Sequence, residues 1–246
     1  MGFEPEEIAK FPWFADVSLG SRAAIAEHLE LRTVGRGCVL FDEASAGGLY
    51  LVTQGRFKVI RSPHTGRGST LMVMGPGDIL SDLPIIDPRP RLVSATALVE
   101  SQAGWIDEDS LSDLVDRYQD ISALLLRVVA RCLRRMASAM SDIVSAEIPQ
   151  RVAKALLSLA LQFGTLERNG TVDVDHGLTQ GELAQLVGAS RESVNKVLST
   201  FASRGWISVH SRSFVVLDPG SLEIAAGWKE RSNRPEGRGA RLFAVS

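Results

Sequence analysis

Two helix-like segments, each with its own capping residue, meet at a glycine within residues 178–201, and this pair constrains the fold more than any other feature of the chain. Thr179 and Glu182 are three residues apart, as in a capping box, which satisfies two backbone N–H groups at the start of a helix. Gly188 can adopt the left-handed conformation that ends that helix, and Ser190 can cap the next one. The spacing predicts a helix-turn-helix.

We expect the second helix to cover residues 191–203, with one apolar face and one polar face. Arg191 and Glu192 suit base readout, because arginine pairs with the O6/N7 edge of guanine and glutamate accepts from the N4 amine of cytosine. Asn195 and Lys196 follow one turn later, where they can contact phosphates or further bases. The apolar residues recur at intervals of three and four and form one buried stripe: Val194, Val197, Leu198 and Phe201.

A second interpretation of this polar face is a solvated surface with an ion pair between Glu192 and Lys196, which are four residues apart. The capped helix and the glycine turn that precede the face favour DNA binding instead. The polar face is therefore the first candidate for a functional site.

A pair of short strands follows the second helix. Gly205 fits the position after the last helical turn, and the β-rich runs 206–209 and 214–217 flank the loop 210–213, as in a hairpin. This addition predicts a winged helix. Arg212, at the tip of the wing, is placed to contact phosphate, although an arginine in a loop is more often only solvated.

The first part of the chain alternates short β-rich runs with glycine turns. Regular spacing of this kind predicts a small antiparallel barrel or roll. Ahead of the runs, residues 18–31 have helical periodicity, and we expect this helix to pack on the side of the barrel. The runs lie at residues 38–41, 49–53, 57–60, 70–74 and 92–98.

From Ser110 the pattern becomes helical and continues to Pro149, which interrupts a helix and pushes Ile148 toward an extended conformation. Apolar residues within this stretch alternate at spacings of four and three, as in a heptad seam. The helix can pack on its own barrel or form a coiled coil with a second chain, and further apolar residues such as Leu124 and Val128 suggest both. The predicted dimer seam consists of Leu125, Val129, Cys132, Met136, Ala139 and Ile143.

These elements predict an α+β protein with an N-terminal antiparallel β-roll, a long dimerisation helix and a C-terminal winged helix-turn-helix. Within the last of these we also expect a helix at 150–163, a loop at 164–170 and one or two helical turns at 222–228. The predicted domains are the β-roll with flanking helices at 1–109, the dimerisation helix at 110–147, the DNA-binding domain at 148–225 and a flexible basic tail at 226–246.

The net charge of the chain is small and unevenly distributed. The whole chain carries -2; residues 147–246 have 12 Lys+Arg against 10 Asp+Glu, or +2, and residues 1–142 have 15 against 19, or -4. Because no strongly positive field is present, affinity for DNA should depend on a few placed cations and on dimerisation.

Several other classes of protein are disfavoured. Cys38 and Cys132 are far apart and show no C-x-x-C spacing, so we expect two buried thiols in a reducing cytosol and no metal or iron–sulfur site. No apolar run approaches a membrane span, and residues 1–10 lack the basic start of a signal peptide, so we expect a cytoplasmic protein. No catalytic arrangement of nucleophile, base or paired carboxylates is evident, so we do not expect an enzyme.

The β-roll, the long helix and the segments 178–196 and 204–207 together resemble the catabolite activator (cyclic-AMP receptor) and Fnr family of bacterial transcription regulators. The resemblance covers nearly the whole chain and is closest to the actinobacterial cyclic-AMP-receptor-like branch. It implies a homodimer that binds double-stranded DNA and has RNA polymerase as a further partner.

The resemblance also assigns roles within the helix-turn-helix. It implies operator readout by Arg191, Glu192 and Lys196, with Gln180 near the phosphate backbone. The full DNA-binding set that we predict is Thr179, Gln180, Ser190, Arg191, Glu192, Ser193, Asn195, Lys196 and Arg212.

The family has an effector site, and here the chain departs from the family pattern. Cyclic-nucleotide binders carry Gly-Glu-Leu, in which glutamate binds the ribose hydroxyl, and then an arginine for the cyclic phosphate followed by Ser or Thr. This chain keeps Arg91, which can form a bidentate phosphate pair. It has Ser81 in place of the glycine, Asp82 in place of the longer glutamate, and Leu92 in place of the hydroxyl residue. Pro84 has no N–H to offer.

On the long helix, Met136 and Ala137 align with the polar pair that contacts adenine in relatives. Losing hydrogen bonds at both ends of a nucleotide, at very roughly 1 kcal/mol each, costs orders of magnitude in affinity. We therefore predict weak or absent cyclic-AMP binding and no cofactor. The predicted degenerate pocket comprises Gly77, Ser81, Asp82, Leu83, Arg91, Leu92, Met136 and Ala137.

The leading hypothesis is a homodimeric regulator that binds a palindromic operator through the helix 191–203. One alternative is a regulator gated by cyclic AMP or another anionic nucleotide bound through Arg91. Another is a sensor or interaction module whose DNA binding is vestigial. Retardation of the protein's own promoter DNA at physiological salt would distinguish the last alternative from the other two.

Overall fold

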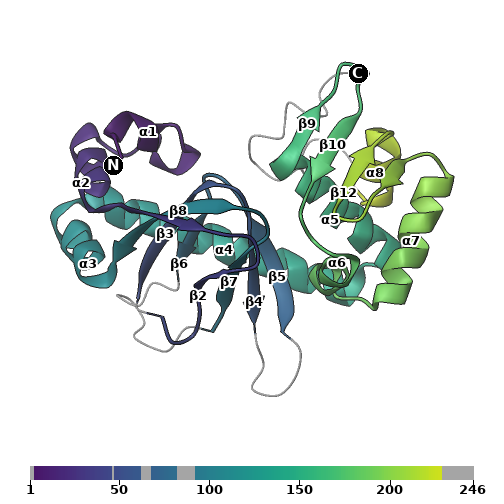
Figure 1. Cartoon of the computed structure of the whole chain (residues 1–246), viewed down its shortest axis with the longest axis horizontal. Coiled ribbons are helices and arrows are strands. Elements are labelled where there is room, and N and C mark those ends of the chain that lie inside the picture. The colour runs from purple at the N-terminus through teal and green to yellow at the C-terminus, as the bar shows by residue number, and fades with distance from the viewer. Residues whose placement is uncertain (1–2, 46, 62–67, 82–91, 229–246) are drawn as a thin grey trace. The chain divides into compact units, whose positions relative to one another are not determined.

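The computed structural model describes residues 3–45, 47–61, 68–81 and 92–228, and the chain divides into two compact units, residues 1–137 and 138–246 (Figure 1). Most of the strands lie in the first unit, and helices predominate in the second. The predicted α+β class is confirmed.

Two four-stranded sheets form the β-roll of the first unit. All pairings between the described strands of the roll are antiparallel, as predicted. One sheet has the order β1 (Glu30–Val34), β8 (Ser101–Asp107), β3 (Gly48–Gln54) and β6 (Ile79–Ser81); the other has the order β2 (Val39–Phe41), β7 (Ser94–Ala97), β4 (Phe57–Arg61) and β5 (Ser69–Met74).

Alternating side chains of the β1-β8-β3-β6 sheet enter two different cores, because successive residues of a strand point to opposite faces. Tyr50 and Val52 of β3 enter a core shared with the second sheet, which includes Phe57. Leu49 and Leu51 enter a core shared with the helices. Those helices are α1 (Pro5–Ala9), the short η1 (Pro12–Phe14), α2 (Leu19–His28), α3 (Glu108–Arg117) and α4 (Gln119–Ser145).

The helix expected at residues 18–31 is shorter than predicted. Ser18 is the N-cap of α2, but the helix ends at His28, and Leu29 is already extended (φ -86°, ψ 108°). Leu31 lies in β1, which pairs with β8. Tertiary pairing with a strand about 70 residues away overrides the local periodicity. Strands β1, β6 and β8 were also missing from the predicted runs.

The single long helix predicted from residue 110 is in fact two helices. α3 and α4 are separated by Tyr118, which is extended (φ -127°, ψ 103°). Asp107 caps α3 by accepting from the Ser110 N–H at 2.9 Å. The apolar pattern does not reveal the break, because Leu114 of α3 and Ile121 of α4 enter the same core.

The expectation that both cysteine thiols are buried was wrong. Cys38 and Cys132 are both exposed rather than buried. Cys38 precedes the first residue of β2, and Cys132 follows Leu125, the last buried residue of α4. In the described part of the chain, no helix combines the length and the apolar character needed to cross a membrane.

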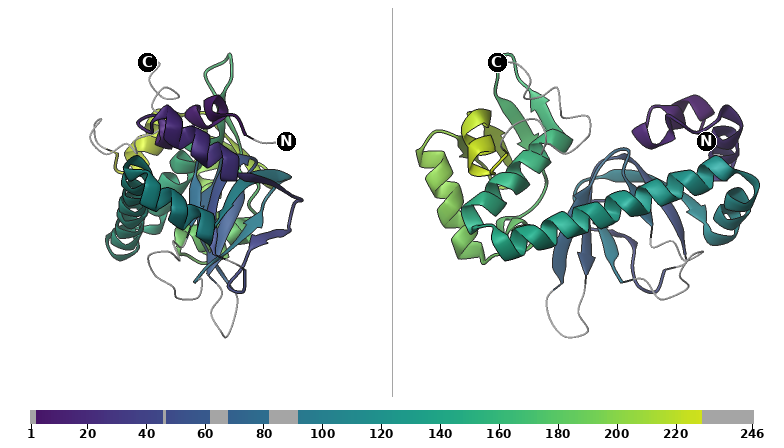
Figure 2. Two further views of the ribbon diagram at one scale, coloured as in Figure 1. Left: turned by 90° about the vertical axis from the view of Figure 1, so that its left-hand side faces the viewer. Right: turned by 180° about the vertical axis from the view of Figure 1, so that it is seen from behind.

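The second unit is built around α5 (Ile148–Phe163), which packs against α6, α7 and α8 (Figure 2). Its strands form one antiparallel sheet of order β11-β12-β10-β9. The elements after α5 are β9 (Gly164–Leu166), β10 (Val172–Asp175), α6 (Gln180–Val187), α7 (Arg191–Ser203), β11 (Ile207–Val209), β12 (Ser213–Val216) and α8 (Pro219–Ala225).

Both helices of the helix-turn-helix and both strands of the wing lie within one residue of their predicted limits. The expected loop at 164–170 is wrong for residues 164–166, which form β9, whereas residues 167–170 lie in the connection to β10. β10 pairs with β9 and with β12 of the wing. Pro149 lies in the first turn of α5, so the extended residue is Glu147 rather than Ile148. The predicted tail lies outside the described residues from residue 229 onward.

Candidate nucleic-acid interface

The start of α6 carries the predicted capping box. The Thr179 hydroxyl accepts from the Glu182 N–H at 3.2 Å, and the Glu182 carboxylate accepts from the Thr179 N–H at 2.8 Å. The same carboxylate accepts the Thr179 hydroxyl proton at 3.0 Å. The hydroxyl is therefore engaged within the protein, and DNA contact by the Thr179 side chain stays a prediction.

The turn between α6 and α7 is held by a residue outside it. Gly188 ends α6 in the left-handed conformation (φ 70°, ψ 41°), as predicted. Arg151 of α5 donates from Nη1 to the carbonyl oxygens of Val187 at 3.1 Å and Gly188 at 3.0 Å. Carbonyls at a helix end lack intrahelical partners, so this side chain completes the cap. Sequence reasoning missed Arg151, because no local pattern links it to a turn 37 residues away.

α7 begins at the predicted residue. The Ser190 hydroxyl accepts from the Ser193 N–H at 3.1 Å and donates to the Ser193 hydroxyl at 2.9 Å, so Ser193 keeps its own hydroxyl proton for a further acceptor. Val194, Leu198 and Phe201 are buried, which sets the rotation of the helix. That rotation leaves three charged side chains exposed: Arg191, Glu192 and Lys196.

The charged side chains of α7 are exposed to solvent. Glu192 and Lys196, both in the described range 92–228, do not form the ion pair that accompanied the solvated-face interpretation. Asn195 differs from the exposed charged residues of α7 because it is half-buried. Within the described part of the chain, its buried Oδ1 atom has no hydrogen-bond partner. Its side chain is thus turned partly inward, and a DNA contact would require a new rotamer or a bridging water.

The wing is attached to the segment that precedes α6. The Arg212 carbonyl oxygen accepts from the N–H groups of His176 at 3.2 Å and Gly177 at 3.0 Å. The Arg212 Nη1 atom donates to the Gly177 carbonyl oxygen at 3.0 Å. The guanidinium is therefore half-buried and partly engaged, rather than free at the tip of the wing. A phosphate contact would use its remaining N–H groups.

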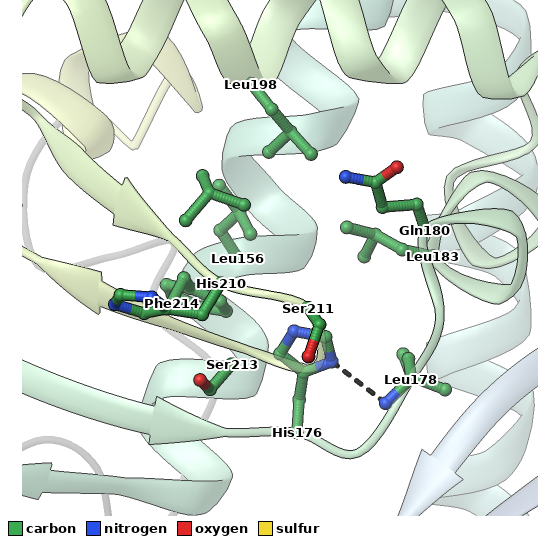
Figure 3. Close-up of a pocket in the computed structure, with 11 residues that line it drawn as sticks. Leu156, His176, Leu178, Gln180, Leu183, Leu198, His210, Ser211, Ser213 and Phe214 are labelled. Atoms are coloured by element: carbon green, nitrogen blue, oxygen red, sulfur yellow. Dashed lines mark hydrogen bonds between the residues drawn. The ribbon is translucent and has the colours of Figure 1, made fainter.

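A small pocket lies between the wing and helices α5, α6 and α7 (Figure 3). Its walls are mainly apolar, and Gln180 is among the polar residues that line it. The His176 ring borders the pocket, and its Nδ1 atom accepts from the Leu178 N–H at 3.1 Å (Figure 3). This ring nitrogen therefore carries no proton. The pocket is part of the packing that joins the wing to α6.

The first part of α4 has one face packed in the core of the first unit, and an apolar face of the helix is exposed along its length. Leu125 is buried in the helix-packed core of the first unit, so it does not belong to an exposed seam as predicted. Cys132 and Ala139 are exposed beside the apolar face. Leu126, Leu133 and Met140, which were not in the predicted seam, are 68%, 66% and 68% exposed. Six exposed apolar residues, called the α4 stripe below, follow spacings of three and four: Leu126, Val129, Leu133, Met136, Met140 and Ile143.

Only part of the predicted effector pocket can be described. Gly77 lies in a turn with φ 90°, and its N–H donates to the Val52 carbonyl oxygen at 2.8 Å. Leu92, Met136 and Ala137 are exposed. The remaining predicted residues are Asp82, Leu83 and Arg91, which lie outside the described residues, and Ser81, which is described only by its place in β6.

The chain matches two protein-family models and has curated relatives over most of its length. A cyclic nucleotide-binding domain matches residues 31–118, and a Crp-like helix-turn-helix domain matches residues 150–224. The CRP-like cAMP-activated global transcriptional regulator of Mycobacterium tuberculosis is 42% identical over 214 residues, which are 87% of this chain and 95% of the relative. The Cyclic AMP receptor protein of Thermus thermophilus is 28% identical, over 91% of this chain and 90% of the relative.

Solved structures share the fold. FixK2 from Bradyrhizobium japonicum has a TM-score of 0.70 at 16% identity, covering 80% of this chain and 96% of that one. A CRP family transcriptional regulator from Thermus thermophilus has a TM-score of 0.67 at 24% identity, with the same coverage of 80% and 96%. At such identities the likeness concerns the fold alone.

Proposed function

Since the chain belongs to the Crp/Fnr family of DNA-binding transcription regulators, we propose that it acts as a homodimer that binds a palindromic operator through α7. The observation that carries the proposal is the start of α7, where a capped helix presents Arg191 and Glu192 to solvent. In a helix-turn-helix, the N-terminal end of the second helix is the part that reaches base edges in the major groove.

Two classes of contact follow from the chemistry of the polar side chains of α6 and α7. Arg191 pairs with guanine and Glu192 accepts from cytosine, and a good base contact discriminates against the wrong base by about 1–3 kcal/mol. Lys196 and Gln180 bind phosphate oxygens, which sets the position of the protein but carries no sequence information. The N-termini of α6 and α7 add backbone N–H groups to the phosphate contacts.

The proposed dimer forms along the α4 stripe. Its residues alternate at spacings of three and four, which is the heptad pattern of a left-handed two-stranded coiled coil. A monomer would leave this stripe in water, and a continuous exposed apolar surface of this kind marks an interaction site. A two-fold symmetric dimer places two recognition helices about 34 Å apart, the spacing of adjacent major grooves.

We further propose that the cyclic nucleotide-binding domain binds cyclic AMP weakly or not at all. This proposal stands on residues of this chain: Ser81, Asp82 and Leu92 replace polar or small groups suited to a cyclic nucleotide, and Met136 is apolar. The relative from M. tuberculosis is named as cAMP-activated, so the proposal separates this chain from that relative. Arg91 still offers one cation for an anionic ligand.

Selection from random duplex DNA tests the proposed function directly. The full chain is incubated with a random-sequence library without nucleotide, and bound duplexes are sequenced while the oligomeric state is measured by sedimentation velocity. The expected result is a dimer that enriches an inverted repeat with half-site centres about 10 base pairs apart. A monomeric protein at micromolar concentration, or enrichment of no inverted motif, would contradict the proposal.

A further inference from the structure

Three arginines on one face of α4 contact two parts of the first unit, the segment in and just after η1 and the turn before β6. Arg127, Arg131 and Arg135 are four residues apart, a spacing that places side chains on the same side of a helix. In the same order, their partners are the Asp16 carboxylate at 3.5 Å, the Trp13 ring at 4.2 Å and the Asp78 carboxylate at 3.6 Å.

The last two of these contacts hold a part of α4 that has little apolar attachment. Leu125 is the last buried residue of the helix, and the apolar side chains of the α4 stripe are exposed. Among the described residues, the polar contacts that join residues 129–137 to the rest of the first unit are made by Arg131 and Arg135. Arg135 also approaches the Met74 sulfur, at 3.9 Å from Nη1.

The carboxylate that meets Arg135 is held rigidly by the roll. Asp78 Oδ2 accepts from the Gly75 N–H at 2.9 Å, and the Asp78 N–H donates to the Gly75 carbonyl oxygen at 2.9 Å. The Asp78 carbonyl oxygen accepts from the Val52 N–H of β3 at 2.9 Å. These hydrogen bonds fix the Asp78 backbone and Oδ2, and they therefore also fix the position of Oδ1, the atom that Arg135 contacts.

The ion pair carries a desolvation cost on its Asp78 side. The Asp78 side chain is only 13% exposed and that of Arg135 is 46% exposed. Burial raises the pKa of Asp78 above its ordinary value, in spite of the Gly75 N–H and the Arg135 guanidinium, which both favour the ionised form. Desolvation of this kind offsets much of the attraction between the partners of a buried pair. A role in fixing geometry therefore accounts for the pair better than a contribution to stability.

We infer that Asp78 and Arg135 are positioning residues whose ion pair fixes α4 on the roll, so that the dimer takes its DNA-competent arrangement without a bound nucleotide. The inference rests on the proposed function and gives it a mechanism. In a two-state regulator an effector acts by its differential affinity for the two states, so a chain with a degenerate effector site needs a resident interaction that biases the equilibrium. Arg135 precedes Met136, one of the two α4 positions assigned to the effector pocket.

The test compares full-length variants that differ by one polar group. Asp78→Asn keeps the size of the side chain and an acceptor for the Gly75 N–H but removes the charge. Arg135→Gln removes the cation, and Arg135→Lys retains it. Arg134→Gln is the matched control, because it removes the same charge from an exposed neighbour on α4. Each is assayed, without nucleotide, for affinity toward the operator selected by the wild type, for thermal unfolding, and for amide hydrogen exchange in α4.

The inference expects Asp78→Asn and Arg135→Gln each to weaken operator binding about tenfold, within the usual range for coupling between sites. The double variant should bind the operator no more weakly than either single variant, and Arg135→Lys should bind the operator more tightly than Arg135→Gln. Amide hydrogen exchange should become faster at residues 129–145 in the two single variants. The unfolding midpoint of Asp78→Asn should equal or exceed that of the wild type.

Unchanged affinity and unchanged exchange in both single variants would overturn the inference. It would equally be overturned by losses of affinity that are additive in the double variant and parallel to losses in unfolding midpoint, since that pattern is expected of a merely structural pair. A wild type that selects no operator would contradict the proposed function instead, and hydrogen exchange in α4 would still decide the role of the pair.

Discussion

The Arg151 Nη1 atom lies 3.0 Å from the carbonyl oxygen of Gly188, so a side chain of α5 holds the turn between the two helices of the helix-turn-helix. Gly188 supplies the conformation of the turn, and Arg151 supplies partners for the carbonyls that this conformation leaves unpaired. The geometry of α6 relative to α7 therefore depends on a residue outside both.

Replacing Arg151 with methionine should lower the free energy of unfolding of the second unit by about 1–3 kcal/mol, because two carbonyl acceptors lose a charged donor. Urea unfolding followed by circular dichroism measures the loss. Arg168→Met is the matched control, since Arg168 is exposed in the turn between β9 and β10. Equal stability of the two variants would show that the cap contributes nothing.

Arg191→Ala and Lys196→Ala should weaken DNA binding in different ways. Loss of Arg191 should relax the preference at one base pair of each half-site, with a cost of about 1–3 kcal/mol on the preferred sequence. Loss of Lys196 should weaken binding to all sequences alike. It should also reduce the slope of log affinity against log salt concentration by the amount expected for about one phosphate contact. Fluorescence anisotropy on single-substitution operators separates the two effects. Wild-type specificity in Arg191→Ala would remove the assignment of Arg191.

A charge in the α4 stripe should dissociate the dimer. Leu133→Glu places a carboxylate in the middle of the stripe and its symmetric copy opposite, which should shift the protein to monomer at micromolar concentration. Ser141→Glu introduces the same residue on an exposed part of α4 outside the stripe and should remain dimeric. Sedimentation velocity measures both. Dimers of unchanged stability in Leu133→Glu would place the interface elsewhere.

Cyclic AMP should bind more weakly than a dissociation constant of about 10 μM, or about -7 kcal/mol, in isothermal titration. The reason is that both ends of the nucleotide lose suitable partners: Ser81 replaces a glycine, Asp82 replaces a longer carboxylate, Leu92 replaces a hydroxyl residue, and Met136 is apolar. Restoring a hydroxyl with Leu92→Ser and Met136→Thr together should strengthen binding. Tight binding by the wild type would refute the prediction.

The pH dependence of stability should reveal the burial of Asp78. Because burial raises its pKa in the folded state above the ordinary 3.8, the folded chain holds this proton to a higher pH than the unfolded chain does. As the pH falls through the raised pKa toward the unfolded value, the wild type should therefore gain stability relative to Asp78→Asn. The charged groups that oppose this shift are Arg135 and Arg131.

The difference in free energy of unfolding between the wild type and Asp78→Asn, measured in urea at several pH values, isolates this effect, because other acidic groups cancel. A wild type that loses stability relative to the variant on acidification would mean that the ion pair outweighs desolvation.

The helix-turn-helix could be predicted residue by residue because its determinants are local. The Thr179–Glu182 box, the left-handed Gly188 and the Ser190 cap each act within four residues, and the structure has all three. The antiparallel roll was predictable at the level of architecture, because strand periodicity and glycine turns recur along residues 38–98.

Features that depend on distant residues were not predictable. The side-chain partners of Arg151 and Arg212 lie 37 and 35 residues away, and no local signal marks them. The heptad pattern of α4 includes apolar residues on two faces, so periodicity alone assigned Leu125 to the dimer seam, whereas packing against the helix-covered core buries it. Tyr118 interrupts the helix without proline or glycine, which left the break invisible.

Three hydroxyl groups at the starts of α6 and α7, those of Thr179, Ser190 and Ser193, are already hydrogen-bonded in the protein alone. The helix termini thus adopt their final geometry before any duplex arrives, and preorganisation reduces the conformational entropy lost on association. In the proposed complex, the groups that remain to be ordered are a few long side chains, with Arg191 first among them. Discrimination between sequences would then depend on restricting the rotamers of these few side chains, while the backbone keeps its conformation.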